Sequence, residues 1–190
     1  KGRLEVRVTA KKKKRSDIKI EMMESVVTEA VGRKMRASKE NLMDVTCEYN
    51  QFCFFEEVNF LTISGTARRT REDEDCSGDN FTVMEMNTGQ TFMSICDGMG
   101  SGKKARQYSE MVIDMLERLL ESGFSESTSL KLINSILLTG NQWQEPAAVD
   151  MALIDQYSGI CQFLKLGAAC TYIKRGNWVE CIKSTSLPMG

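Results

Sequence analysis

The sequence predicts an α+β fold in which two antiparallel sheets are flanked by helices. Strand patterns cluster toward both ends of the chain, and two amphipathic helix patterns lie between them. The last strand patterns are joined by short turns such as Tyr157-Ser158-Gly159, whereas parallel strands would need long crossovers. The length of 190 residues is enough for one domain with a short extension.

The first part of the chain reads as a strand, a basic loop and a helix. Alternation of Leu4, Val6 and Val8 with polar residues predicts the strand. Five cations at 11–15 indicate a solvated loop, with contact to nucleic acid as a weak alternative. An apolar stripe over 18–35 predicts a helix that packs on its surroundings, regulates a site or forms a homodimer. We assign residues 1–57 to an N-terminal linker or regulatory segment.

The second part carries most of the strand patterns. Two helices are expected after Lys103 and from Phe124 to Thr139, with Gly123 as the cap between them. A turn at 87–90 joins two strands into a hairpin. The predicted strands cover 58–66, 81–86, a segment ending at Asp97, 149–155, 160–166, 170–174 and 178–184.

An acid followed by glycines is the most informative local pattern. The strand ending at Asp97 leads into Gly98, Gly100 and Gly102, whose backbone groups can face a ligand. Neither a Walker loop nor a dinucleotide fingerprint fits these residues. The hairpin brings Asp79 close to Asp97, and paired carboxylates suit Mg²⁺ or Mn²⁺. A polar sheet end without a metal is the alternative interpretation.

Composition excludes several kinds of chemistry. The chain contains no histidine, so Ser-His and Cys-His nucleophile pairs and HExxH zinc sites are impossible. The 25 basic and 26 acidic residues nearly balance, which argues against general attraction to nucleic acid or membranes. We interpret the seven cysteines as reduced core thiols of a cytoplasmic protein. No apolar run has the length of a membrane span or the form of a signal peptide.

Several motifs, taken in order, closely resemble the stage II sporulation protein E family of PP2C-like metal-dependent serine/threonine phosphatases. The likeness covers residues 58–190, which we assign to the N-terminal part of a PP2C-like domain with an α/β/β/α sandwich. The motifs are Ser77-Gly78-Asp79, Asp97-Gly98-Met99-Gly100, the helix at 131–138, the strand at 149–155, Phe163-Leu164-Lys165-Leu166-Gly167, Tyr172-Ile173-Lys174-Arg175-Gly176 and Ser186-Leu187-Pro188-Met189-Gly190.

The resemblance implies a phosphatase that holds two Mn²⁺ or Mg²⁺ ions. In the family pattern, the carboxylate of Asp97 bridges both ions, the carbonyl of Gly98 binds one, and Asp79 supports the site. Water activated between the ions attacks the phosphorus of a phosphoserine. The implied substrate is a phosphorylated anti-sigma-factor antagonist, and its dephosphorylation activates a sporulation sigma factor.

The resemblance also implies features outside this sequence. Two further metal-binding acids follow the Leu-Pro-x-Gly segment in the family, so we expect the chain to be truncated at its C-terminus and impaired in activity. Asp150 and Asp155 are not assigned as ligands. The parent protein is expected to carry a membrane anchor, with this domain on the cytoplasmic side. The alternative from another class is a phosphatase-fold scaffold that binds a partner without catalysis.

Overall fold

The computed structural model describes residues 3–13, 18–38, 45–70, 72, 75–86, 88–98, 100, 102–139 and 146–190. Contacts divide the chain into two compact units, the first built from residues 1–61 and 87–89 and the second from residues 62–86 and 90–190. The predicted boundary was after Glu57. Lys14 and Arg15 of the predicted basic loop lie outside the described residues.

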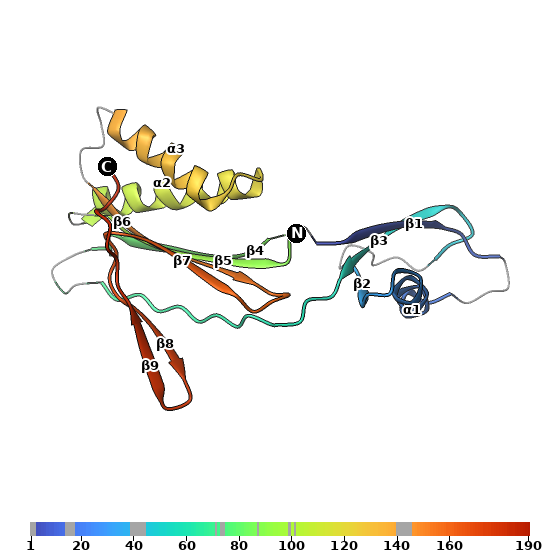
Figure 1. Ribbon diagram of the computed structural model, residues 1–190. Helices are drawn as coiled ribbons and strands as arrows, with labels where there is room; N and C mark the ends of the chain where they lie inside the picture. Colours follow the sequence, from blue (N-terminus) through green and yellow to red (C-terminus); the bar gives the residue numbers. More distant parts are fainter. Residues whose placement is uncertain are drawn as a thin grey trace. The chain divides into compact units, whose positions relative to one another are not determined.

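The first unit is a three-stranded antiparallel sheet with one helix (Figure 1). Its elements are β1 (Glu5–Ala10), α1 (Ile20–Val31), β2 (Met35–Ala37) and β3 (Asn50–Glu56), with strand order β1-β3-β2. The unit has its own core, made of Met23, Val27, Met35, Val45, Phe52 and Phe54. This core shares no residue with the core of the second unit.

The helix of the first unit is shorter than the predicted helix at 18–35. It ends at Val31 because Gly32 takes the left-handed conformation, with φ of 69°, and donates its N–H to the Thr28 carbonyl. Glycine in this position is a common helix end. Met35 therefore begins β2 instead of extending the helical stripe.

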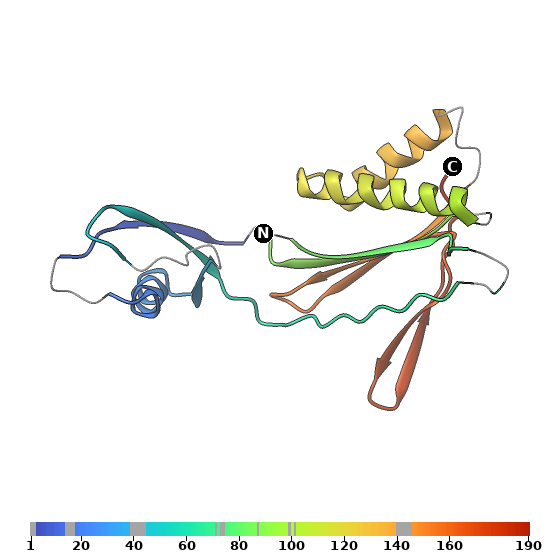
Figure 2. The same ribbon diagram turned by 180° about the vertical axis from the view of Figure 1, so that it is seen from behind.

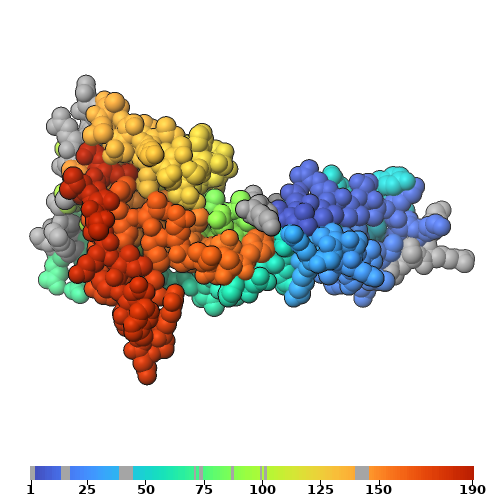
Figure 3. Space-filling view, viewed as in Figure 1, coloured from blue at the N-terminus to red at the C-terminus, as the bar shows by residue number. Residues whose placement is uncertain are grey.

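The second unit contains a four-stranded antiparallel sheet with the order β4-β5-β6-β7. Helices α2 and α3 cover one face of this sheet (Figures 1 and 2), and the β8–β9 hairpin projects from it (Figure 3). The elements are β4 (Asp79–Met86), β5 (Gln90–Gly98), α2 (Gly102–Glu121), α3 (Glu126–Thr139), β6 (Ala147–Asp155), β7 (Cys161–Leu166), β8 (Thr171–Arg175) and β9 (Trp178–Ile182).

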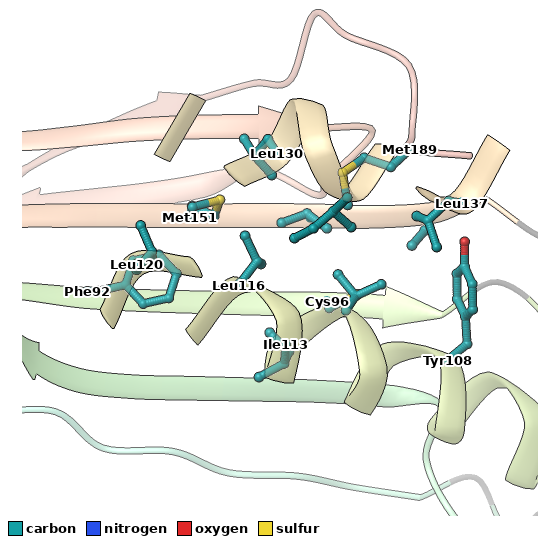
Figure 4. Close-up of a cluster of buried hydrophobic side chains, with 14 of the residues drawn as sticks. Phe92, Cys96, Tyr108, Ile113, Leu116, Leu120, Leu130, Leu137, Met151 and Met189 are labelled. Carbon is teal, nitrogen blue, oxygen red and sulfur yellow. The ribbon is translucent and has the colours of Figure 1, made fainter. Parts of the chain in front are cut away.

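The main core lies between these two helices and the sheet (Figure 4). Strand side chains alternate between the two faces. On β5, Phe92 and Cys96 point toward the helices and are fully buried, whereas Ile95 lies on the other face and is exposed. The helices contribute Tyr108, Val112, Ile113, Leu116, Leu120, Leu130, Ile133 and Leu137 to the core. Burial of each large apolar side chain contributes about 1.5–3 kcal/mol.

The chain end at 186–190 closes the core beside α3. Met189 is buried and forms an antiparallel bridge with Ala147. Gly167 donates its N–H to the Ser186 carbonyl at 3.1 Å, and a Cβ at Gly167 would lie 2.4 Å from Pro188. The Leu-Pro-x-Gly motif is therefore a packing element in this unit.

The α+β class and the antiparallel pairing are confirmed. The α2–α3 pair and the β4–β7 sheet form two adjoining layers of the expected sandwich, and β8–β9 forms a separate sheet. The predicted strand at 58–66 is wrong, because this segment belongs to none of the strands in the described part of the chain. Its second half runs along the sheet face away from the helices (Figures 1 and 2). High β propensity gives an extended chain, but a strand also needs a hydrogen-bonded neighbour.

The prediction of core thiols is wrong for most of the cysteines. All seven cysteines lie in the described part of the chain; Cys96 alone among them is buried, and none forms a disulfide. Cys47, Cys161, Cys170 and Cys181 are exposed, and Cys53 and Cys76 are intermediate. Apolar composition around a cysteine does not reveal which face of a strand it occupies.

Candidate functional site

The two acids from the sequence motifs lie directly opposite each other. Asp79 is the first residue of β4 and faces Asp97 near the end of β5, in the register that the hairpin predicted. Both side chains are exposed, on the sheet face away from the helices. The Ser77 hydroxyl donates to Asp79 Oδ2 at 3.1 Å and accepts the Asp79 N–H at 3.3 Å, which fixes this carboxylate at the strand start.

Glycines on the other face let the first turn of α2 approach the same strand ends. A Cβ at Gly98 would lie 2.4 Å from the Ala105 carbonyl oxygen, and one at Gly78 would lie 2.9 Å from the Ala105 Cβ. Both distances are shorter than van der Waals contact permits. Gly98 is therefore required for packing, independently of any role of its own carbonyl in metal binding.

The acid pair creates a local concentration of negative charge. Like charges directly opposite on neighbouring strands destabilise a sheet unless something compensates them. The neighbouring Cys96 thiol responds to this charge. Burial, followed by the charges of Asp97 and Asp79, raises the pKa of Cys96 to about 12. A divalent cation would remove the repulsion between the two carboxylates.

A groove of about 670 Å³ runs along the helix-free face of the sheet. Its walls include the extended segment at 63–69, the outer side chains of β4 and β5, and Thr171 at the start of β8. Asp79 and Asp150 both line it. The groove is bounded by residues of the second unit alone.

A part-buried ion pair on the same face was missed by sequence reasoning. Lys165 on β7 contacts Asp150 Oδ2 on β6, and their side chains are 5% and 22% exposed. Lys165 Nζ also donates to Thr171 Oγ1 at 2.7 Å, and that hydroxyl donates to Asp150 Oδ2 at 2.6 Å. The available signal was a single acid among small residues on the outer face of β6, between Ala148 and Ala152.

The donor types present fit a hard divalent cation in part. Asp79, Asp97 and the Gly98 carbonyl offer oxygen ligands, which Mg²⁺ and Mn²⁺ prefer. Within the described part of the chain, no three carboxylates or thiols lie close enough together to hold a metal ion. The acid pair by itself offers fewer ligands than such an ion needs, so the other ligands would have to be water or further oxygen donors.

The fold is that of a PP2C phosphatase domain. The chain matches the structure of the PP2C phosphatase domain and a fragment of the regulatory domain of the cell fate determinant SpoIIE from Bacillus subtilis. The TM-score is 0.70 with 26% identity, and the match covers 100% of this chain and 55% of that one.

The sequence comparisons identify the family. The family model for stage II sporulation protein E matches residues 87–190, which include Asp97 and Gly98. The chain belongs to the stage II sporulation protein E family. It is 33% identical to the Bacillus subtilis stage II sporulation protein E over 142 residues, covering 75% of this chain and 17% of the relative. It is 30% identical to the Priestia megaterium protein over 165 residues, covering 87% of this chain and 28% of the relative.

The chain thus spans between about a sixth and a third of the length of these two relatives. Within the described part of the chain, no helix is both long enough and apolar enough to cross a membrane.

Proposed function

We propose that the chain contributes the Asp79–Asp97 site of a metal-dependent phosphoserine protein phosphatase. The observation that carries this proposal is the position of the two acids. They face each other on the open side of the sheet in a fold that matches a PP2C phosphatase domain. A scaffold has no use for two opposed carboxylates, which cost stability when no cation is bound.

In this proposal the carboxylate of Asp97 and the carbonyl of Gly98 would hold the divalent ions, Mn²⁺ or Mg²⁺, and Asp79 would support the site. Bound divalent ions would lower the pKa of water and neutralise charge on the phosphoryl group. Ser77 keeps the Asp79 carboxylate oriented toward the groove end through its hydroxyl. None of these roles needs histidine, which the chain lacks.

The proposed substrate is a phosphoserine on an anti-sigma-factor antagonist protein, and the proposed outcome is activation of a sporulation sigma factor in the cytoplasm. Membership of the stage II sporulation protein E family supports this assignment. The groove supports it as well, because the exposed Asp79 lines it and its volume could admit a phosphoserine side chain.

The test is Mn²⁺ binding followed by phosphoserine hydrolysis, measured on this chain and on any longer natural form of it. We expect Asp97→Asn to abolish both, since a neutral amide cannot bridge two cations. Asp155→Asn is the matched control, because Asp155 caps the turn after β6 by accepting the Tyr157 N–H at 2.8 Å. Hydrolysis that survives Asp97→Asn would contradict the proposal and favour the scaffold.

A further inference from the structure

The Asp150–Lys165 pair lies on the same sheet face as the proposed site, and Asp150 lines the groove, but the family motifs assign the pair no role. Asp150 Oδ1 is buried and has no hydrogen-bond partner among the described residues. The carboxylate therefore depends on Lys165 and Thr171 for its compensation. Lys165 is withdrawn from water almost completely and Asp150 in part, which is costly, and apolar residues of similar volume would often be as stable. Stability alone gives little reason for the pair.

The strand order shows which charge of the ion pair lies nearer to the Asp79–Asp97 site. The sheet runs β4-β5-β6-β7, so Asp150 on β6 lies between Asp97 on β5 and Lys165 on β7. Asp150 is the register partner of Ile95, two residues from Asp97 and on the same face. Diagonal neighbours of this kind lie about 7–8 Å apart. The negative end of the ion pair therefore faces the proposed cation site, and the positive end faces away.

We propose that Asp150 and Lys165 are positioning residues that set the cation affinity of the Asp79–Asp97 site through their charges. The inference rests on the proposed function, because it concerns the affinity of the same site. Lys165 holds the Asp150 side chain in place in the groove wall. It does not cancel the electric field of the Asp150 carboxylate at Asp97, because Asp150 lies one strand nearer to Asp97 than Lys165 does. Thr171 fixes the geometry by bonding to both partners.

A charge role and a merely structural role predict different results. Removing Asp150 leaves an unpaired cation near the site, so bound Mn²⁺ should be disfavoured. Removing Lys165 leaves an unpaired anion, so bound Mn²⁺ should be favoured even though the protein becomes less stable. A structural role would weaken binding in both variants, because both disturb the same packing.

The experiment measures Mn²⁺ affinity from the electron paramagnetic resonance signal of the free ion, at constant ionic strength. We expect Asp150→Asn to weaken binding roughly tenfold and Lys165→Met, whose charge lies one strand farther from the site, to tighten it about threefold. These factors are of the order that one charge produces at an effective dielectric constant near 20 after salt screening. The double variant Asp150→Asn/Lys165→Met, which buries no unpaired charge, should fall between them, about threefold weaker than the wild type. Asp155→Asn, at the far end of β6, should stay within about twofold of the wild type.

The outcomes separate the two proposals. If Asp97→Asn abolishes binding but Asp150→Asn and Lys165→Met leave it unchanged or weaken it equally, this inference is overturned and the proposed site stands. If the wild type binds no Mn²⁺, or Asp97→Asn has no effect, the proposed function fails and this inference fails with it. Should either single variant not fold, an unchanged affinity in the double variant would overturn the inference.

Discussion

Substituting Gly98 by alanine tests whether packing of α2 requires this glycine. The added methyl group would lie 2.4 Å from the Ala105 carbonyl oxygen and 3.1 Å from its carbonyl carbon. It would have to move by about 1 Å to reach an ordinary contact near 3.5 Å. The obstacle is helix backbone, so the first turn of α2 must shift on the sheet. We expect Gly98→Ala to destabilise the protein by about 3 kcal/mol, the upper part of the range for overpacking.

Combining each glycine variant with Ala105→Gly shows which atoms of Ala105 cause the loss of stability. Gly78→Ala meets the Ala105 Cβ at 2.9 Å, so Ala105→Gly should relieve that variant. The same change should not relieve Gly98→Ala, where the clash is with backbone. Gly65→Ala is the control, since nothing lies within 4 Å of its added Cβ.

Thermal denaturation measures the cost, and hydrogen exchange of α2 peptides shows where it falls. A loss of 3 kcal/mol corresponds to a fall in Tm of about 6–12 °C for a chain of this size. The reasoning is refuted if Gly98→Ala stays within about 0.5 kcal/mol of the wild type, the range of neutral surface changes. Rescue of Gly98→Ala by Ala105→Gly would refute it as well.

Three further predictions concern the core, a thiol and the acid pair. Leu116→Ala should lower the free energy of unfolding in urea by about 2–5 kcal/mol, because the Leu116 side chain is 0% exposed. Leu138 is 66% exposed, so Leu138→Ala should lower it by less than about 0.5 kcal/mol. Equal losses in the two variants would contradict the observed core. Burial and the charges of Asp97 and Asp79 raise the pKa of Cys96 from 9.0 to about 12, so its contribution to stability is present below pH 9 and lost as pH rises toward 12. We expect Cys96→Val to reduce the loss of stability between pH 9 and pH 12. An unchanged pH profile would contradict the raised pKa of Cys96. In the presence of a chelator, Asp79→Asn should stabilise the protein by about 0.2–1 kcal/mol through lost repulsion, and a destabilisation would show that the acids do not repel each other.

The hairpin geometry was predictable because it depends on local signals. A turn between two alternating segments sets both the pairing and the faces, so the proximity of Asp79 and Asp97 followed from sequence spacing. The α2–α3 pair was equally accessible, because the apolar stripe and Gly123 are local features. What these features do chemically came from the family motifs.

The ion pair and the extended segment were not predictable in the same way. Asp150 and Lys165 meet only through the register of β6 with β7, and Thr171 joins them from beyond the next turn. No local pattern specifies a contact of this kind. The segment at 58–66 has strand-like residues, but whether it forms a strand depends on a neighbour that its own sequence does not contain.

Because side chains alternate along β5, the two faces of this strand carry residues with different roles. Cys96 and Gly98 face the helices and are buried, whereas Ile95 and Asp97 lie on the exposed face of the sheet. Insertion of a single residue just before β5 would exchange the residues on its two faces. The Asp97 carboxylate would then face the apolar core, and the Cys96 thiol would face the opposite side. The proposed site therefore depends on the exact length of the chain before β5 as well as on its carboxylates. A one-residue change in that length would disrupt both the core packing and the proposed metal site.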